Sequence, residues 1–190
     1  MGVLIGPNTL YYVIVRPKGK LREDFDFSDE KVRKPALLRP EMGERGTGDM
    51  ATTVIAITNQ KGGVGKTTTA AALLTGLHRR GAAVLGVDMD PQGSLGFSLG
   101  LDIEHCTTIY DVFRGQAEPE QAIVRTDTCD ILPSNILLSG AELEFNRPGR
   151  EFLLKTALSK VEDQYDYIII DTPPALSLLT VNAYVATDSL

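Results

Sequence analysis

The chain has 190 residues, of which 43% are hydrophobic and 23% charged, and its formal net charge at pH 7 is −6. This length supports one domain with a substantial core, and the composition is ordinary for a soluble globular protein. No apolar run approaches the roughly 18 residues of a transmembrane helix, and two widely spaced cysteines lack the spacing of a metal site. The segment Met1–Pro7 lacks a secretory pattern, so a cytoplasmic protein is expected.

The first 49 residues differ from the rest in composition. They hold nine Lys/Arg and eight Asp/Glu, whereas residues 50–190 hold ten and seventeen. One short strand is predicted over Thr9–Val15, but the charged stretch from Arg16 to Asp49, interrupted by Pro and Gly, has too little apolar surface to fold alone. We expect residues 1–49 to be a poorly ordered extension, with Met50 as the natural start of a domain over residues 50–190. A regulatory arm is the alternative interpretation.

After Met50, apolar runs typical of buried strands alternate with amphipathic helical patterns. This alternation predicts right-handed βαβ crossovers and an α/β fold, with a parallel sheet and helices on both faces. Four strong strands are found and the chain ends at VATDSL, where another would begin, so we expect the C-terminal part of the fold to be incomplete. The predicted strands are Thr53–Thr58, Ala83–Asp88, Cys129–Ser134 and Tyr165–Asp171, and the predicted helices are Thr67–Arg80, part of Asp102–Thr128, and Glu151–Val161.

The stretch NQKGGVGKTTT, residues 59–69, stands between the first of these strands and the first helix. Its glycines allow a tight turn whose N–H groups point at an anion, and the helix N-terminus adds partial positive charge. In such a phosphate-binding loop Lys66 reaches the β- and γ-phosphates, Thr67 ligates Mg²⁺ and Thr68 bonds the α-phosphate. The standard pattern is broken, however, because Gln60 replaces a glycine and a second lysine, Lys61, is present. The predicted nucleotide-binding residues are Gly62, Gly63, Val64, Gly65, Lys66, Thr67 and Thr68.

Two further motifs place carboxylates at the ends of predicted strands. In DMDPQGSLG, Asp88 and Asp90 follow a strand at i and i+2 and so point to the same side. Ligands of open α/β sheets lie beyond the carboxyl ends of strands, which places both residues near the phosphates, to hold a Mg²⁺-bound water or to orient the attacking water. In YIIIDTPP, Asp171 ends an apolar strand, like the carboxylate that coordinates Mg²⁺ in phosphate-loop NTPases. The predicted metal-binding residues are Thr67, Asp88 and Asp171.

The segments KGGVGKTTT, VDMDPQGSLG, ILPSNILLSGAELE and YDYIIIDTPPALSLLTVNA resemble the ParA/Soj family of partition ATPases, within the MinD-like, SIMIBI-type group of P-loop NTPases that has a deviant Walker A motif. The resemblance runs from about Thr53 to Leu190. It implies a homodimer that sandwiches two ATP molecules, in which Lys61 contacts the nucleotide of the partner subunit. It also implies that Asp90 is needed for hydrolysis and that Asp88 and Asp171 serve Mg²⁺. The predicted catalytic residues are Lys61, Lys66 and Asp90, with ATP and Mg²⁺ as cofactors.

The same resemblance implies a slow ATPase whose ATP-bound dimer binds DNA nonspecifically and whose hydrolysis a ParB-type centromere-binding protein stimulates, so that chromosomes or plasmids move apart. The family continues past Leu190 with the adenine-contacting segment and most of the basic DNA-binding surface. We therefore expect DNA binding and nucleoid association only of a full-length form, and no membrane partner. Three alternatives stay open: a MinD-like membrane-cycling regulator of division, an inactive truncated fragment, and an electron-transfer relative. The last would need cysteines that bind a cluster, and neither Cys106 nor Cys129 has the sequence context of such a ligand.

Overall fold

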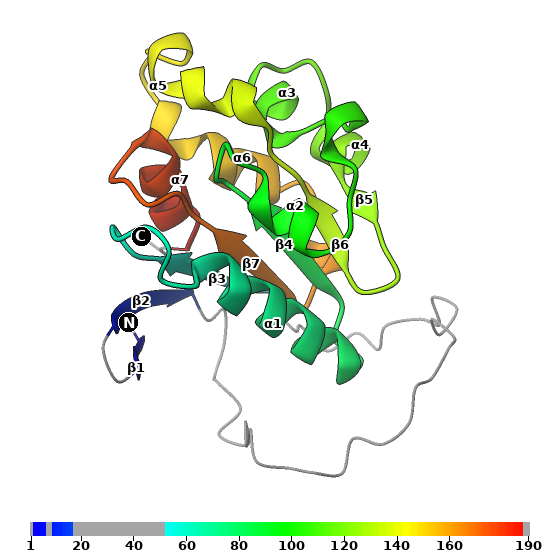
Figure 1. Ribbon diagram of the computed structural model, residues 1–190. Coiled ribbons are helices and arrows are strands. Elements are labelled where there is room, and N and C mark those ends of the chain that lie inside the picture. The colour runs from blue at the N-terminus through cyan, green and yellow to red at the C-terminus, as the bar shows by residue number, and fades with distance from the viewer. Residues whose placement is uncertain (1, 7–8, 17–51, 188–190) are drawn as a thin grey trace.

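The computed structural model describes residues 2–6, 9–16 and 52–187, which Figure 1 shows in colour. Within these residues seven strands form one sheet in the order β1-β2-β3-β7-β4-β6-β5. The inner strands β3, β7, β4 and β6 run parallel, whereas β5 and the β1–β2 pair are antiparallel to their neighbours. The strands are β1 (Gly2–Gly6), β2 (Thr9–Arg16), β3 (Thr53–Thr58), β4 (Val84–Asp88), β5 (Val124–Arg125), β6 (Asp130–Leu132) and β7 (Tyr167–Asp171).

Helices cover both faces of this sheet (Figure 1), which confirms the expected α/β fold class. Side chains alternate along each strand, so Val54 and Ala56 enter one core while Ile57 enters the other. The helices α1 and α2 cover the second core, and α3 to α7 cover the first. No helix in the described part of the chain is long and apolar enough to cross a bilayer. The helices are α1 (Lys66–Arg79), α2 (Ser94–Ser98), α3 (Ile109–Phe113), α4 (Pro119–Ala122), α5 (Ala141–Glu144), α6 (Leu153–Leu158) and α7 (Leu178–Thr187), with 3-10 turns η1 (Ile103–His105), η2 (Ile136–Gly140), η3 (Arg150–Phe152) and η4 (Glu162–Gln164).

Most predicted elements after residue 50 are present with shifted ends. The first predicted strand matches β3 residue for residue, and α1 begins and ends one residue before its prediction. The helix predicted over Glu151–Val161 is shorter, because η3 precedes α6 and the amide oxygen of Asn182 accepts the Leu154 N–H at 3.0 Å near the start of α6. The helix α7 was not predicted, since it is buried around most of its circumference and so has no amphipathic stripe.

The N-terminal segment contains more structure than predicted. The strand expected at Thr9–Val15 is present as β2, and β1, which was not predicted, pairs with it. Residues 2–6 and 9–16 join the sheet because an apolar run can pair with an open sheet edge even when the surrounding sequence is polar, and the expectation of a poorly ordered extension over residues 1–49 stays a prediction. The remainder of residues 1–49, and Met50, lie outside the described residues.

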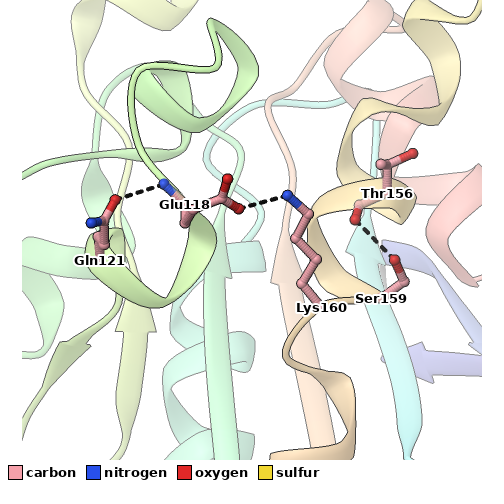
Figure 2. A network of polar contacts seen from close by, with 5 residues as sticks. All are labelled: Glu118, Gln121, Thr156, Ser159 and Lys160. Carbon is pink, nitrogen blue, oxygen red and sulfur yellow. Dashed lines mark hydrogen bonds and ion pairs between the residues drawn. The ribbon is translucent and has the colours of Figure 1, made fainter.

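A polar network joins α4 to the end of α6 on the surface, as Figure 2 shows. The Lys160 ammonium lies 2.6 Å from a carboxylate oxygen of Glu118, and the Glu118 N–H donates to the Gln121 side chain at 2.9 Å. Beside it, the Ser159 hydroxyl donates to the Thr156 carbonyl at 2.9 Å. Because both charged partners are well exposed, this ion pair is screened by solvent and adds little to stability.

Candidate nucleotide and magnesium site

The loop between β3 and α1 contains two glycines in the left-handed region of backbone space. Gly63 has φ 67° and Gly65 has φ 90°, a conformation that other residues rarely adopt. Gly65 is the N-cap of α1 and offers no side chain to the first N–H groups of the helix, while the Thr69 N–H bonds back to the Gly65 carbonyl at 2.9 Å. The start of α1 therefore presents N–H groups and the positive end of the helix dipole, as phosphate binding requires.

The two lysines of this loop have opposite surroundings. Lys66, the first residue of α1, is buried with 7% of its surface exposed. Lys61 is exposed, its N–H donates to the Asn59 side chain at 2.9 Å, and no ion pair joins its ammonium to another residue in the described ranges. A buried ammonium needs a nearby negative charge, whereas an exposed one is free to contact another molecule.

Asp171, the last residue of β7, is fully buried and its two carboxylate oxygens accept no hydrogen bond from the described residues. Burial raises its pKa to about 6; the neighbouring Thr67 hydroxyl opposes this shift, the Asp90 carboxylate adds to it, and the Lys66 ammonium lowers it. A buried carboxylate without a partner is rare in a folded protein and calls for a ligand. Oxygen ligands beside a phosphate site suit Mg²⁺, so Asp171 and Thr67 fit that ion.

Asp88, the last residue of β4, lies directly opposite Asp171 in the strand register. Its two carboxylate oxygens accept the N–H groups of Asp90 at 3.0 Å and of Leu95 at 2.9 Å. Burial, then the charge of Asp171, raises the pKa of Asp88 to about 7. Asp88 therefore adds charge to the site but is oriented by the backbone of residues 89–95, which makes it less available to a metal than Asp171.

Asp90 lies at the mouth of the site and is partly exposed. The Ser134 hydroxyl, at the end of β6, donates to the Asp90 carbonyl, and the Gln92 N–H donates to the Asp90 carboxylate at 3.0 Å. Ser134 is fully buried and was not predicted to take part, because this contact joins segments that are distant in the sequence. The backbone of Asp90 is thus held by Asp88 at the end of β4 and by Ser134 after β6.

The turn after β7 lies against the phosphate loop. The Thr172 hydroxyl donates to the Ile57 carbonyl in β3 at 2.8 Å, and a Cβ placed on Gly62 would lie 3.8 Å from the Cβ of Pro174. The structure therefore brings Lys66, Thr67, Asp88, Asp90 and Asp171 together at the carboxyl edge of the sheet. Thr68 and Lys61 lie on the exposed side of the same loop.

Comparison with known proteins agrees with this arrangement. Residues 52–190 match the family described as an AAA domain. Among curated relatives, the sporulation initiation inhibitor protein Soj of Bacillus subtilis is 48% identical over 143 residues, which are 72% of this chain and 56% of Soj. The chromosome partitioning protein ParA of Myxococcus xanthus is 44% identical over 152 residues, 78% of this chain and 53% of that protein.

The chain belongs to the ParA/Soj family. Among solved structures, one similar protein is a cobyrinic acid a,c-diamide synthase from Mycobacterium smegmatis with bound ATP analogue and magnesium. It matches with a TM-score of 0.69 and 47% identity, and the matched region covers 72% of this chain and 55% of the synthase chain. This ParA/Soj chain spans about half the length of the curated relatives it matches.

The raised pKa values of Asp88 and Asp171 predict how stability depends on pH when no metal is bound. Both values, about 7 and about 6, lie above the ordinary 3.8, so the folded state holds protons that the unfolded state has lost. This stabilisation is complete below pH 3.8 and is lost as pH rises through 6 and 7. We expect the two residues together to lower the free energy of unfolding on the order of 2–3 kcal/mol between pH 5.5 and 8.

Mg²⁺ is expected to offset this loss at pH 8, where the carboxylates are ionised, and to have little effect at pH 5.5. Urea unfolding of the wild type and of Asp171→Asn, each with and without Mg²⁺ at both pH values, measures the effect. The variant keeps the shape of the side chain, so it should lose the Mg²⁺ response and part of the pH dependence. An equal Mg²⁺ response in both proteins would place the ion elsewhere.

Proposed function

We propose that this chain is an ATPase of the chromosome or plasmid partition type, which binds ATP with Mg²⁺, hydrolyses it slowly and pairs with a second copy while ATP is bound. The observation that carries the proposal is the position of Asp171. Its unpartnered carboxylate lies beside Lys66 and Thr67 at the start of α1, where a phosphate-bound cation would meet both a negative ligand and the helix terminus.

Similar proteins of different described roles support nucleotide binding, so the comparisons support this part of the proposal better than they support the cellular role. One similar structure is described as an amide-forming synthase with an ATP analogue and magnesium. Another is described as a plasmid partition protein of Borrelia burgdorferi, with a TM-score of 0.64 at 32% identity over 73% of this chain and 63% of that one. Partition is preferred because a curated relative at 44% identity and this solved structure at 32% identity are both described as partition proteins, whereas the similar synthase, at 47% identity, is not described as one.

Each residue of the site has a role in this reaction. The N–H groups of the loop and of the first turn of α1 hold the phosphate oxygens, and Lys66 neutralises the β- and γ-phosphates. Bound Mg²⁺ would supply positive charge to the same oxygens, held by Asp171 and Thr67, with Asp88 acting through a water. Asp90 orients the attacking water, because Asp90 is partly exposed whereas Asp88 and Asp171 are fully buried.

An exposed lysine and exposed apolar side chains support self-association. Lys61 is exposed in the loop, and three apolar side chains in the segments that follow β6 and β7 are exposed: Leu176, between β7 and α7, by 67%, and Ile136 and Leu137, at the start of η2, by 61% and 56%. Large exposed apolar residues near a nucleotide site are typical of an interface. In such a pair Lys61 would add its charge to the γ-phosphate bound by the other copy, as an arginine finger supplied in trans does.

The remaining proposed partners are DNA and a centromere-binding protein. We propose a cytoplasmic cycle in which the ATP-bound pair holds DNA without sequence preference, and a ParB-type centromere-binding protein triggers hydrolysis and release. Residues 50–190 carry ten basic and seventeen acidic residues, so the charge that holds DNA phosphates must come from outside this range.

Lys61→Ala is expected to leave ATP binding within about twofold of the wild type, since Lys61 lies on the exposed side of the loop. Turnover should fall by about tenfold to a thousandfold, because a positive charge supplied in trans to a γ-phosphate stabilises the transition state. Titration calorimetry measures binding and phosphate release measures turnover. A variant that turns over at the wild-type rate, in a protein whose wild type shows ATP-dependent pairing, would remove Lys61 from the mechanism.

A further inference from the structure

The strand that leads into the phosphate loop, β3, has its outer edge covered by β2. The two strands pair antiparallel over five residues, from Tyr12 opposite Thr58 to Arg16 opposite Val54. On its other side β2 pairs with β1, whose register reaches only from Thr9 to Val13. Within the described residues the segment Ile14–Arg16 is therefore paired with β3 alone, and β1 and β2 form an antiparallel pair at the edge of the sheet (Figure 1).

The topology of the sheet assigns this same edge to another strand. The connection from β3 to β4 passes through α1 on one face, and the connection from β6 back to β7 passes through α6 on the other face. Right-handed crossovers move in opposite directions on opposite faces. Since α7 lies on the same face as α6, a parallel strand that follows α7 would move past β7 toward β3. Both neighbours of β7 are already present, so the position beyond β3 is the one it would take.

We propose that the outer edge of β3 is an acceptor site for one extended strand, and that in this chain the antiparallel pair β1–β2 occupies, through β2, the position that the crossover through α7 gives to a following strand. The two strands exclude each other, because an edge has one row of free N–H and C=O groups. The ligand class is an extended segment that bonds through its backbone, as in recognition by strand addition. This inference does not rest on the proposed ATPase reaction.

The helix α7 also contacts the outer edge of β3. It packs against both β3 and β2, and the Tyr184 hydroxyl lies 3.0 Å from the Thr58 hydroxyl at the end of β3. Thr58 is also the residue opposite Tyr12 in β2, and the phosphate loop begins at the next residue, Asn59. The strand that occupies the edge therefore pairs with the residue just before the phosphate loop. Exchanging that strand for another would change the contacts at the start of the loop.

The test uses the full chain and a pair of proline substitutions, Ile14→Pro with Val15→Pro. Successive N–H groups of a strand point to opposite sides, so one of these two donates to β3, and proline removes it. The control pair, Ile14→Ala with Val15→Ala, keeps both N–H groups. Hydrogen exchange followed by mass spectrometry compares Thr53–Thr58 with Val84–Asp88, because β4 is bonded on both sides by β7 and β6 and serves as an internal reference.

The proposal predicts that β3 exchanges about tenfold faster or more in the proline pair than in the alanine pair. It also predicts that a synthetic peptide of residues 9–16, added in excess, restores the protection of β3. If the proline pair loosens β4 as well, restoration by the peptide still supports an edge site, and failure of the peptide to restore protection overturns it. Equal exchange of β3 in the wild type, the alanine pair and the proline pair would also overturn it.

Discussion

Lys66→Ala is expected to weaken the binding of ATP with Mg²⁺ by about 10- to 100-fold. Lys66 is buried beside Asp171 and is the first residue of α1, so its ammonium is held where the phosphates must lie. A charge-assisted hydrogen bond contributes roughly 1.5–3 kcal/mol, which corresponds to about 10- to 100-fold in affinity. In addition, loss of the ammonium leaves the buried carboxylate of Asp171 without its nearby positive charge.

Titration calorimetry measures this affinity, and Lys160→Ala is the matched control. Lys160 is also a lysine, but it is exposed and paired with Glu118 between α4 and α6, as Figure 2 shows. Its removal should leave ATP binding unchanged. Circular dichroism of both variants verifies that they are folded. Wild-type affinity in a folded Lys66→Ala protein would contradict the assignment of the loop.

Asp90→Ala is expected to reduce ATP turnover by about 100-fold or more while nucleotide binding and ATP-dependent pairing persist, because a positioned general base contributes about 100- to 10,000-fold. The surrounding loop should keep its shape in the variant. Asp88 holds the backbone N–H of residue 90 at 3.0 Å and the buried Ser134 hydroxyl holds its carbonyl, and neither contact involves the Asp90 side chain.

The expected product of this variant is a pair of chains locked with bound ATP, which light scattering after size exclusion would detect. Asp90→Asn is the conservative control, since it keeps an oxygen for the Gln92 N–H and removes only the charge. Both variants should behave alike if the negative charge matters. Recovery of turnover in Asp90→Asn would instead assign Asp90 to holding the loop.

Local patterns made the phosphate loop and its strand predictable. The β-branched run of β3, the glycines after it and the apolar face of α1 all agree with one another, and Asp171 follows from the apolar strand that it ends. The places of Lys66 after the loop and of Asp171 at the end of a strand were therefore expected. These signals lie within stretches of about ten residues, which is the range over which a sequence pattern is informative.

Contacts between distant segments could not be predicted in the same way. The Ser134 hydroxyl donates to the Asp90 carbonyl across 44 residues, and no pattern near either residue indicates this contact. The pairing of β2 with β3 depends on which edge of the sheet is open, and the order of the inner strands determines that edge. The residues that fix the geometry of the site are thus less visible in the sequence than those that would touch the ligand.

The most direct test of the central claim, that Asp171 and Thr67 hold Mg²⁺ against the phosphates of ATP, is a titration of ATP into the wild type and into Asp171→Asn with and without Mg²⁺. We predict that Mg²⁺ tightens ATP binding to the wild type by about tenfold or more, and that it has no such effect on the variant, whose binding without Mg²⁺ is unchanged or tighter. The claim would be contradicted by equal tightening in both proteins, or by a folded wild type that binds no ATP.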